Sequence, residues 1–336
     1  MKFALISSDP HNAVQFKINP EQGDATSFMN WVDVWKGYHF FYEDVKKDMS
    51  FLKEYDAVMM SGNPYYMTLI TDIAKFLKDS NTVTIYYPEG SLQLYDNSIN
   101  GFHKEYYDTW NACDVVSSAE EDKIPYYKSF IRGDTIVRFI HVPLREQMES
   151  GEFFIPISNK DKKTCVIYGD NNPNHPMVAL ACAAKLGMNV IGVDIDRGKM
   201  DAIKNYFPNT SFKLYDKLPT YPFLRILGRT AIHFYPTEWI GTARQQISCA
   251  VSGTICIGNR DSHTQKRLFP GLGYDIYDID GMVSIAKSIL QNDNLYHYLS
   301  VEAFNSAKFY SEGNTKARFE EAVESARKIK RSRILV

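Results

Sequence analysis

Short apolar runs alternate with longer amphipathic segments along the first half of the chain. Runs rich in β-branched and aromatic residues predict strands at 2–7, 57–61, 83–87, 115–117 and 135–141. Between two of these runs, Leu69, Ile70, Ile73, Phe76 and Leu77 recur at helical spacing, which predicts a helix over 68–78. Strands that alternate with helices in this way indicate a parallel sheet covered by helices.

A polar, lysine-rich stretch at 158–163 separates this half from a second cycle of the same kind. The pattern there predicts strands at 164–168, 189–194, 211–215, 230–235, 254–258 and 274–277. It also predicts helices at 176–186, 282–311 and 315–330. The second half should therefore form another doubly wound sheet.

We predict an α/β fold of two Rossmann-like, doubly wound parallel-sheet domains, with C-terminal helices that close a cleft between them. The expected domains are residues 1–158 and 159–312, and residues 313–336 should form a helix that packs back on the first domain. Ligands of open parallel sheets bind beyond the carboxyl ends of the strands, so the chemistry should lie on the strand-end loops.

Composition narrows the class of protein. Of the 336 residues 44% are apolar, and no apolar run approaches the roughly 18 residues of a membrane span. The five cysteines are an odd number without a C-x-x-C pair, which favours reduced thiols. A net charge of -2 gives no overall signature of nucleic-acid binding. Together with the absence of a signal-peptide pattern, these features predict a cytoplasmic monomer.

The turn at 168–176 opens the second domain and is a candidate diphosphate cradle. A glycine at a strand end allows close approach to the backbone, and the following helix presents free N–H groups to an anion. The candidate residues are Gly169, Asp170, Asn171 and Asn172. The segment is neither a Walker loop nor a G-x-G-x-x-G fingerprint, so an ordinary capped turn is the alternative.

The stretch from His233 to Gly258 resembles the donor-binding segment of GT-B glycosyltransferases. A strand ends at Tyr235, a turn follows, a helix is predicted over 242–251, and Gly253 ends it. The resemblance implies that the turn and the first helical turn hold the sugar and phosphates of a nucleotide sugar. The residues implied are Tyr235, Thr237, Glu238, Gly241, Arg244 and Gln245, with Ser248 where the family usually has a ribose-binding glutamate. The alternative is an amphipathic helix whose Arg244 is merely solvated.

Glu89 follows the predicted strand at 83–87 and stands between Pro88 and Gly90. A carboxylate there is our candidate general base, which would take the proton of an acceptor hydroxyl in an inverting transfer. The alternative is a solvent-exposed acidic residue in a turn.

The opening residues, 1–17 and 19–24, resemble the start of the T-even phage DNA glycosyltransferases. The likeness continues in order over Tyr55-Asp56, Ile85-Tyr86-Tyr87, Val166 to Gly169 and Lys316-Ala317-Arg318. It implies a UDP-linked donor, donor contacts from Ser8, His11 and Asn12, and catalytic carboxylates at Glu21 or Asp24 as well as Glu89. It also implies a double-stranded phage DNA acceptor that carries hydroxymethylcytosine, and hence the host cytoplasm.

One departure concerns residues 170–177, where the family has arginines for the donor diphosphate and this chain has none. Arg244, or the pair Lys266-Arg267, would have to substitute, so an arabinosyl donor fits as well as a glucosyl one. Asp194-Ile195-Asp196 has the spacing of a metal-binding motif, but a ribose or structural role fits equally, and no metal ligand is assigned.

The leading hypothesis is an inverting transfer from a nucleotide sugar to a hydroxyl group. Basic candidates for contact with a DNA backbone are Lys104, Lys123, Lys128, Arg132, Arg145 and the tail at 328–333. One alternative keeps the fold and assigns an acceptor in surface polysaccharide or glycolipid synthesis. Another is a non-catalytic protein that binds a nucleotide or a sugar.

Overall fold

The computed structural model describes residues 1–8, 27–88, 103–118, 120–169, 175–238 and 244–334. The chain forms two compact units. The described residues up to 145 belong to the first unit together with the C-terminal segment from Tyr310, and residues 146–309 form the second.

The first unit contains a six-stranded parallel sheet with the order β2-β1-β3-β4-β5-β6. Its strands are β1 (Phe3–Ser7), β2 (Tyr38–Phe41), β3 (Ala57–Gly62), β4 (Val83–Pro88), β5 (Val115–Ser118) and β6 (Ile136–Phe139). Five of these strands were predicted, and β2 was missed. It is a four-residue edge strand that pairs only with β1, so its sequence carries little periodicity.

Alternate residues of these strands enter two different apolar cores. Phe3 and Leu5 pack with Trp31 of α1 (Ser27–Trp35) and Phe319 of α15 (Glu312–Ile334), whose rings lie 5.5 Å apart. Ala4 and Ile6 face the other core. The helices on that side are α2 (Tyr42–Val45), α3 (Met67–Phe76), α5 (His103–Ala112) and α6 (Ile124–Phe130), with short 3-10 turns at η1 (Ser50–Glu54), η2 (Pro64–Tyr66) and η3 (Glu121–Lys123). A sheet buried on both faces explains why the strands are apolar throughout.

The second unit contains another six-stranded parallel sheet, with the order β12-β11-β10-β7-β8-β9. Its strands are β7 (Asp161–Tyr168), β8 (Asn189–Val193), β9 (Phe212–Tyr215), β10 (Thr230–Tyr235), β11 (Ile255–Asn259) and β12 (Gly273–Tyr274). All six were predicted to within a few residues. The prediction of doubly wound parallel sheets is thus confirmed in both halves.

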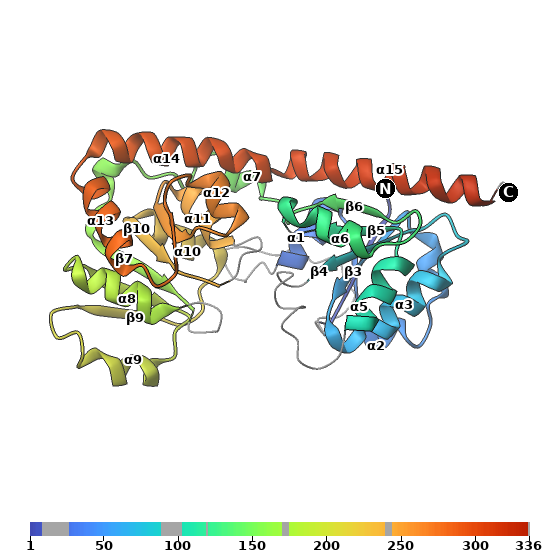
Figure 1. The fold of residues 1–336 in the computed structure, drawn as a ribbon, viewed down its shortest axis with the longest axis horizontal. Helices are drawn as coiled ribbons and strands as arrows, with labels where there is room; N and C mark the ends of the chain where they lie inside the picture. The colour runs from blue at the N-terminus through green and yellow to red at the C-terminus, as the bar shows by residue number, and fades with distance from the viewer. Residues whose placement is uncertain (9–26, 89–102, 119, 170–174, 239–243, 335–336) are drawn as a thin grey trace. The chain divides into compact units, whose positions relative to one another are not determined.

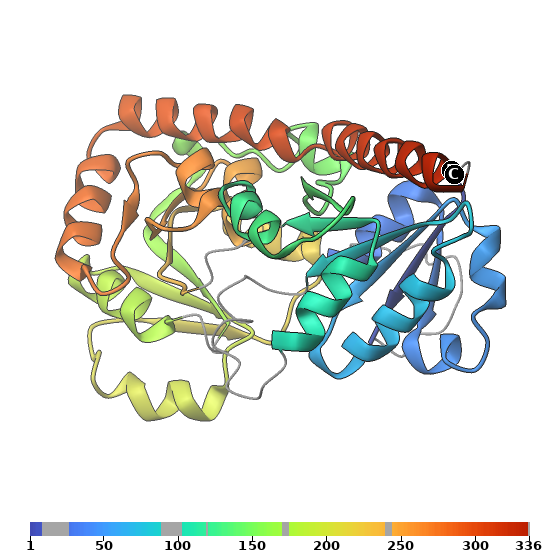
Figure 2. The ribbon, with the colours of Figure 1, turned by 45° about the vertical axis from the view of Figure 1, so that its right-hand side comes forward.

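Helices cover both faces of the second sheet, as can be followed in Figure 1 and Figure 2. Those of this unit are α7 (Glu146–Glu149), α8 (Pro176–Lys185), α9 (Arg197–Lys204), α10 (Thr220–Gly228), α11 (Arg244–Ser252), α12 (His263–Leu268), α13 (Ile279–Leu290) and α14 (Asp293–Ala307), with 3-10 turns at η4 (Ile157–Asn159) and η5 (Lys308–Tyr310) at its end. The single helix predicted over 282–311 was wrong. Asn292 begins a new helix there, because its side chain accepts a 3.0 Å hydrogen bond from the backbone N–H of Leu295.

Each unit has a buried lysine at the C-terminal ends of its helices. Lys160 donates to the carbonyls of Gly228 (2.5 Å) and Ser252 (3.0 Å), which end α10 and α11. Lys330 of α15 donates to the carbonyl of Leu77 (3.0 Å) after α3 and forms an ion pair with Asp114 (3.0 Å). These amines satisfy carbonyls that a helix end leaves without an intrahelical partner.

The five cysteines, Cys113, Cys165, Cys182, Cys249 and Cys256, are buried free thiols. None of the helices in the described part of the chain combines the length and apolar character needed to span a bilayer.

Candidate functional site

The second sheet changes winding direction between β7 and β10. These two strands are neighbours, but the chain continues from β7 to β8 on one side and from β10 to β11 on the other. From the carboxyl ends of β7 and β10 the chain therefore continues in opposite directions. Open parallel sheets bind ligands at such a position. The loop after β7 starts at Gly169 and the loop after β10 starts at Pro236, so the two segments predicted to hold the donor meet here.

Gly169 ends β7 in the left-handed region, with a φ of 69°. Its N–H donates to the carbonyl of Val193 at 2.9 Å, which ties the start of the loop to β8. A residue with a Cβ would be strained in this conformation, so the glycine has a structural reason beside the predicted functional one. Asp170, Asn171 and Asn172 lie outside the described residues.

A hydrogen-bonding contact joins the two loops. The Nε2 atom of His175, at the start of α8, lies 3.0 Å from Oε1 of Glu238, which follows β10. The backbone N–H of His175 also donates to the carbonyl of Pro236 at 3.2 Å. Glu238 was predicted from the sequence, whereas its pairing with His175 was not, because 62 intervening residues separate the two positions.

The floor of this region is buried. Tyr235 and Thr237 are only 8% and 0% exposed, and burial raises the pKa of the Tyr235 phenol well above its usual range. Asn259 at the end of β11 donates to the Thr237 carbonyl at 2.9 Å and so fixes the turn. Of the predicted residues in the turn after β10, Glu238 is the one whose described side chain is largely accessible, at 44%.

His233 lies beneath Tyr235, with the two rings stacked at a centroid distance of 5.8 Å. Its Nδ1 atom is 2.8 Å from the carbonyl of Val166 on β7. Complete burial lowers the pKa of His233 to about 4, so the ring is neutral at physiological pH. A neutral ring donates to Val166 through Nδ1 and supports the site from within the sheet.

The other residues of the predicted donor segment lie in or just before helix α11. Arg244 is exposed and Gln245 and Ser248 are half-buried, while Gly241 lies outside the described residues. Between them, Gln246 is buried and donates to the side-chain oxygen of Gln265 at 3.1 Å. This amide pair links α11 to α12 and was not predicted from the sequence.

The first sheet has its own change of winding direction, between β1 and β3. There Ser8, a predicted donor contact, accepts a 3.2 Å hydrogen bond from the Asn63 amide. Ser7 lies 2.7 Å from Nε2 of the buried His39 on β2, and neither His39 nor Asn63 was singled out from the sequence. Several residues predicted for this side lie outside the described residues, namely His11, Asn12, Glu21, Asp24 and Glu89.

Among the described residues, no three His, Cys, Asp or Glu side chains gather closely enough to hold a metal ion. Asp194 adopts the left-handed region with a φ of 58° where the chain leaves β8. Its N–H donates to the Tyr215 carbonyl at 3.1 Å. This bond ties the turn between β8 and α9 to the end of β9.

Two of the basic residues considered for DNA contact are wrong for that role. Arg145 is 7% exposed and lies 3.7 Å from Asp33, and Lys330 is buried against Asp114. Arg333 pairs with Asp134 at 3.2 Å. Two of the four charges of the tail, Lys330 and Arg333, are therefore engaged in holding α15, whereas Lys328 and Arg331 are exposed.

No protein-family model matches the sequence, and no curated protein is similar enough in sequence to be matched. The fold, in contrast, resembles solved structures over nearly the whole chain. An alpha-glucosyltransferase in complex with UDP-glucose and DNA containing an abasic site is 10% identical, with a TM-score of 0.63 over 96% of this chain and 98% of that one.

HepE of Anabaena, in complex with UDP and glucose, is 9% identical, with a TM-score of 0.70 over 97% of this chain and 100% of that one. TarM is 12% identical, with a TM-score of 0.64 over 84% of this chain and 57% of that one. The topology of the two sheets and these likenesses together show that the chain has the GT-B fold predicted from its sequence.

Proposed function

We propose that this protein is a glycosyltransferase that moves a sugar from a UDP-linked donor to a hydroxyl acceptor. The observation that carries the proposal is the meeting of Gly169, Glu238 and His175 at the change of winding direction in the second sheet. Two proteins with the same fold are described with such ligands, HepE with UDP and glucose and an alpha-glucosyltransferase with UDP-glucose. Glu238 is the accessible polar group at this position, and it is suited to accept hydrogen bonds from sugar hydroxyls.

The donor side is the second unit. We assign the phosphates to the loop after β7, which includes Asp170, Asn171 and Asn172, and to Arg244 at the start of α11. Gly241, Gln245 and Ser248 complete the donor contacts in this proposal. Backbone N–H groups at the starts of α8 and α11 would add partial positive charge.

The acceptor side is the first unit, and hydroxymethylcytosine in double-stranded DNA is the preferred acceptor. Structures with this fold include an alpha-glucosyltransferase with UDP and a DNA that contains a HMU base. In this chain a surface pocket between α5 and α6 is lined by Arg132 beside the exposed ring of Phe130, and by Lys104, which pairs with Asp108 of the same lining at 2.6 Å. Cations beside an aromatic ring are suited to a nucleic-acid backbone and its bases.

The proposed chemistry is an inverting transfer. The acceptor hydroxyl attacks the anomeric carbon, its proton passes to the Glu89 carboxylate, and the bond to the UDP oxygen breaks. Glu89 follows Pro88 at the end of β4. Ser8, His11, Asn12, Glu21 and Asp24 follow β1 and would position the reacting groups.

The test compares the protein with its Glu89→Gln variant. We expect the variant to bind UDP-glucose with unchanged affinity while its turnover falls by about a hundredfold or more, because only proton removal is lost. Equal turnover of the two proteins would exclude Glu89 as the base. If wild-type protein binds UDP-glucose and transfers sugar to no acceptor, the non-catalytic alternative is correct.

The acceptor is tested separately, with hydroxymethylcytosine-containing DNA, unmodified DNA and an oligosaccharide offered in parallel. We expect sugar to appear only in the modified DNA. Transfer to the oligosaccharide alone would favour the polysaccharide alternative.

A further inference from the structure

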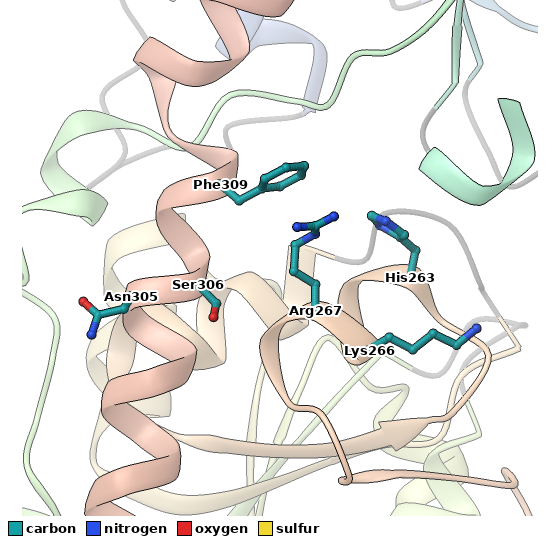
Figure 3. A pocket seen from close by; sticks show the side chains of 6 residues that line it. All are labelled: His263, Lys266, Arg267, Asn305, Ser306 and Phe309. Atoms are coloured by element: carbon teal, nitrogen blue, oxygen red, sulfur yellow. The ribbon is translucent and has the colours of Figure 1, made fainter.

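A basic pocket of about 550 Å³ lies on the second unit, within the range of about 300–1,000 Å³ typical of ligand sites. Its lining comes from two segments that are far apart in sequence. Helix α12 supplies His263, Lys266 and Arg267, and α14 with η5 supplies Asn305, Ser306 and Phe309. We call this set the α12 pocket; Figure 3 shows it from close by.

The three basic residues share one face of α12. His263 and Arg267 are four residues apart and Lys266 lies between them, so their side chains leave the helix on the same side. Figure 3 shows the Arg267 guanidinium and the His263 imidazole standing side by side, while Lys266 extends away from Arg267. The guanidinium carbon of Arg267 lies 3.6 Å from the centre of the Phe309 ring. Stacking of this kind orients a guanidinium and leaves its N–H donors in the ring-parallel plane.

The opposite face of α12 is held firmly. Ser262 caps the helix by accepting from the N–H of Gln265, and Gln265, Thr264 and Leu268 are buried. The Gln265 amide donates to the carbonyls of Cys256 and Leu272, each at 3.1 Å. The basic face is therefore carried by a helix whose position is set in advance, as a binding site requires.

The lining has the chemistry of an anion site. The described residues that line it include no Asp or Glu, and two of them carry a permanent positive charge. Two positive charges within one helical turn attract an anion more strongly than one does. A lysine ammonium and a guanidinium fork are the groups that proteins use to bind phosphate.

We propose that the α12 pocket binds a phosphate group. The source of the phosphate rests on the proposed function, whereas phosphate binding itself can be measured whether or not the protein transfers sugar. The phosphate has two candidate sources, the diphosphate of the nucleotide donor and the backbone of a DNA acceptor. Helix α12 follows β11, whose carboxyl end lies at the same edge of the parallel sheet as those of β7 and β10.

The experiment measures binding of inorganic pyrophosphate to the full chain by calorimetry. The double variant Lys266→Gln/Arg267→Gln should bind at least about tenfold more weakly, because two charge-assisted contacts are lost. The control Lys163→Gln/Lys287→Gln removes two exposed lysines of the same unit and should bind like wild type. Wild-type affinity in the first variant would overturn the proposal.

Loss of the Arg267–Phe309 contact could also affect folding, so a second variant is needed. Lys266 is exposed, and Lys266→Glu reverses its charge without removing a buried group. We expect this variant to keep the wild-type melting temperature and to bind pyrophosphate about tenfold more weakly. Unchanged affinity here would equally overturn the proposal.

UDP and a short DNA duplex then identify the source of the phosphate. Weaker binding of UDP alone by Lys266→Glu assigns the pocket to the donor. Weaker binding of the duplex alone, with a reduced salt dependence, assigns it to the acceptor. Pyrophosphate binding that needs Lys266 in a protein without transfer activity would support this site while contradicting the proposed function.

Discussion

His175 and Glu238 show what the sequence allows at the scale of single residues. Glu238 was selected as a candidate because the stretch from His233 to Gly258 resembles a donor-binding segment. The 3.0 Å contact with His175 was not predictable, because it depends on two strands that are neighbours in the sheet but distant in the chain. His39 and Asn63 were missed for the same reason, since their partners Ser7 and Ser8 lie at the end of β1, far away in the sequence.

Replacing Glu238 by Gln tests its role in the proposed site. The amide keeps the size and one acceptor oxygen but removes the charge. We expect turnover of a UDP-sugar to fall by about a hundredfold, as for other single polar groups that stabilise a transition state. His175→Gln, which retains a hydrogen-bond donor, should lose only a few fold. Wild-type turnover by Glu238→Gln would remove this residue from the site.

His233 predicts a pH dependence of stability. Its folded-state pKa of about 4 lies below the ordinary value of 6.5, so the unfolded chain binds the proton first as the pH falls. Above pH 6.5 the ring is neutral in both states and has no effect; between 6.5 and 4 each step downward favours unfolding. Compared with His233→Gln, wild type should lose about 2 kcal/mol more between pH 7 and 4.5. An equal loss of unfolding free energy in wild type and His233→Gln between the two pH values would contradict this.

At the scale of elements, strong periodicity was predictable and weak periodicity was not. The apolar runs of β1, β3 and β4 are buried on both faces, and their composition alone indicated strands. The edge strand β2 was missed because it pairs with one neighbour alone, so fewer of its positions have to be apolar. The division between α13 and α14 depends on the cap at Asn292, a local signal that a search for long helices passes over.

Lys160 should stabilise the ends of α10 and α11. Burial lowers the pKa of its amine to about 7, while the carbonyls of Gly228 and Ser252 bind the protonated form. Lys160→Met would remove the donor of the Gly228 carbonyl and leave the Ser252 carbonyl with the N–H of Ile155 (3.2 Å), and we expect it to lower the free energy of unfolding by about 3 kcal/mol. Lys163→Met, at an exposed position nearby, should change it by less than about 0.5 kcal/mol. Equal stability of the two variants would show that the amine is dispensable.

Gly258 should be required where β10 and β11 pair. A Cβ atom there would lie 2.9 Å from the carbonyl oxygen of Tyr235 and 2.8 Å from the side-chain oxygen of Gln265. Gly258→Ala must therefore separate the strands, at an expected cost of about 2 kcal/mol in chemical denaturation. Gly313→Ala in the first turn of α15 meets no atom within 4 Å and should be neutral or stabilising. If Gly313→Ala lost more stability than Gly258→Ala, the close approach of Tyr235 and Gln265 to Gly258 would be contradicted.

At the scale of the whole molecule, the fold is preserved where the sequence is not. Identities near 10% accompany a shared arrangement of two parallel sheets, because many apolar sequences satisfy the same pattern of buried strands. The loops at the strand ends are free of that constraint, and in proteins generally such loops carry the binding residues. The sequence therefore predicted the fold well and the ligands only by resemblance. The basic face of α12 forms a pocket together with α14, about 40 residues later in the chain. The pair Lys266-Arg267 could therefore be named from the sequence, but the pocket that it lines could not be predicted.

Transfer of a labelled sugar tests the central claim most directly. The wild-type protein is incubated with UDP-[¹⁴C]glucose or a UDP-linked pentose and with hydroxymethylcytosine DNA, and label in the DNA is measured alongside released UDP. We predict label in the DNA in proportion to the UDP released, and its loss in Glu238→Gln. Tight UDP binding with no label in any acceptor and no UDP released would contradict the claim that this protein is a glycosyltransferase.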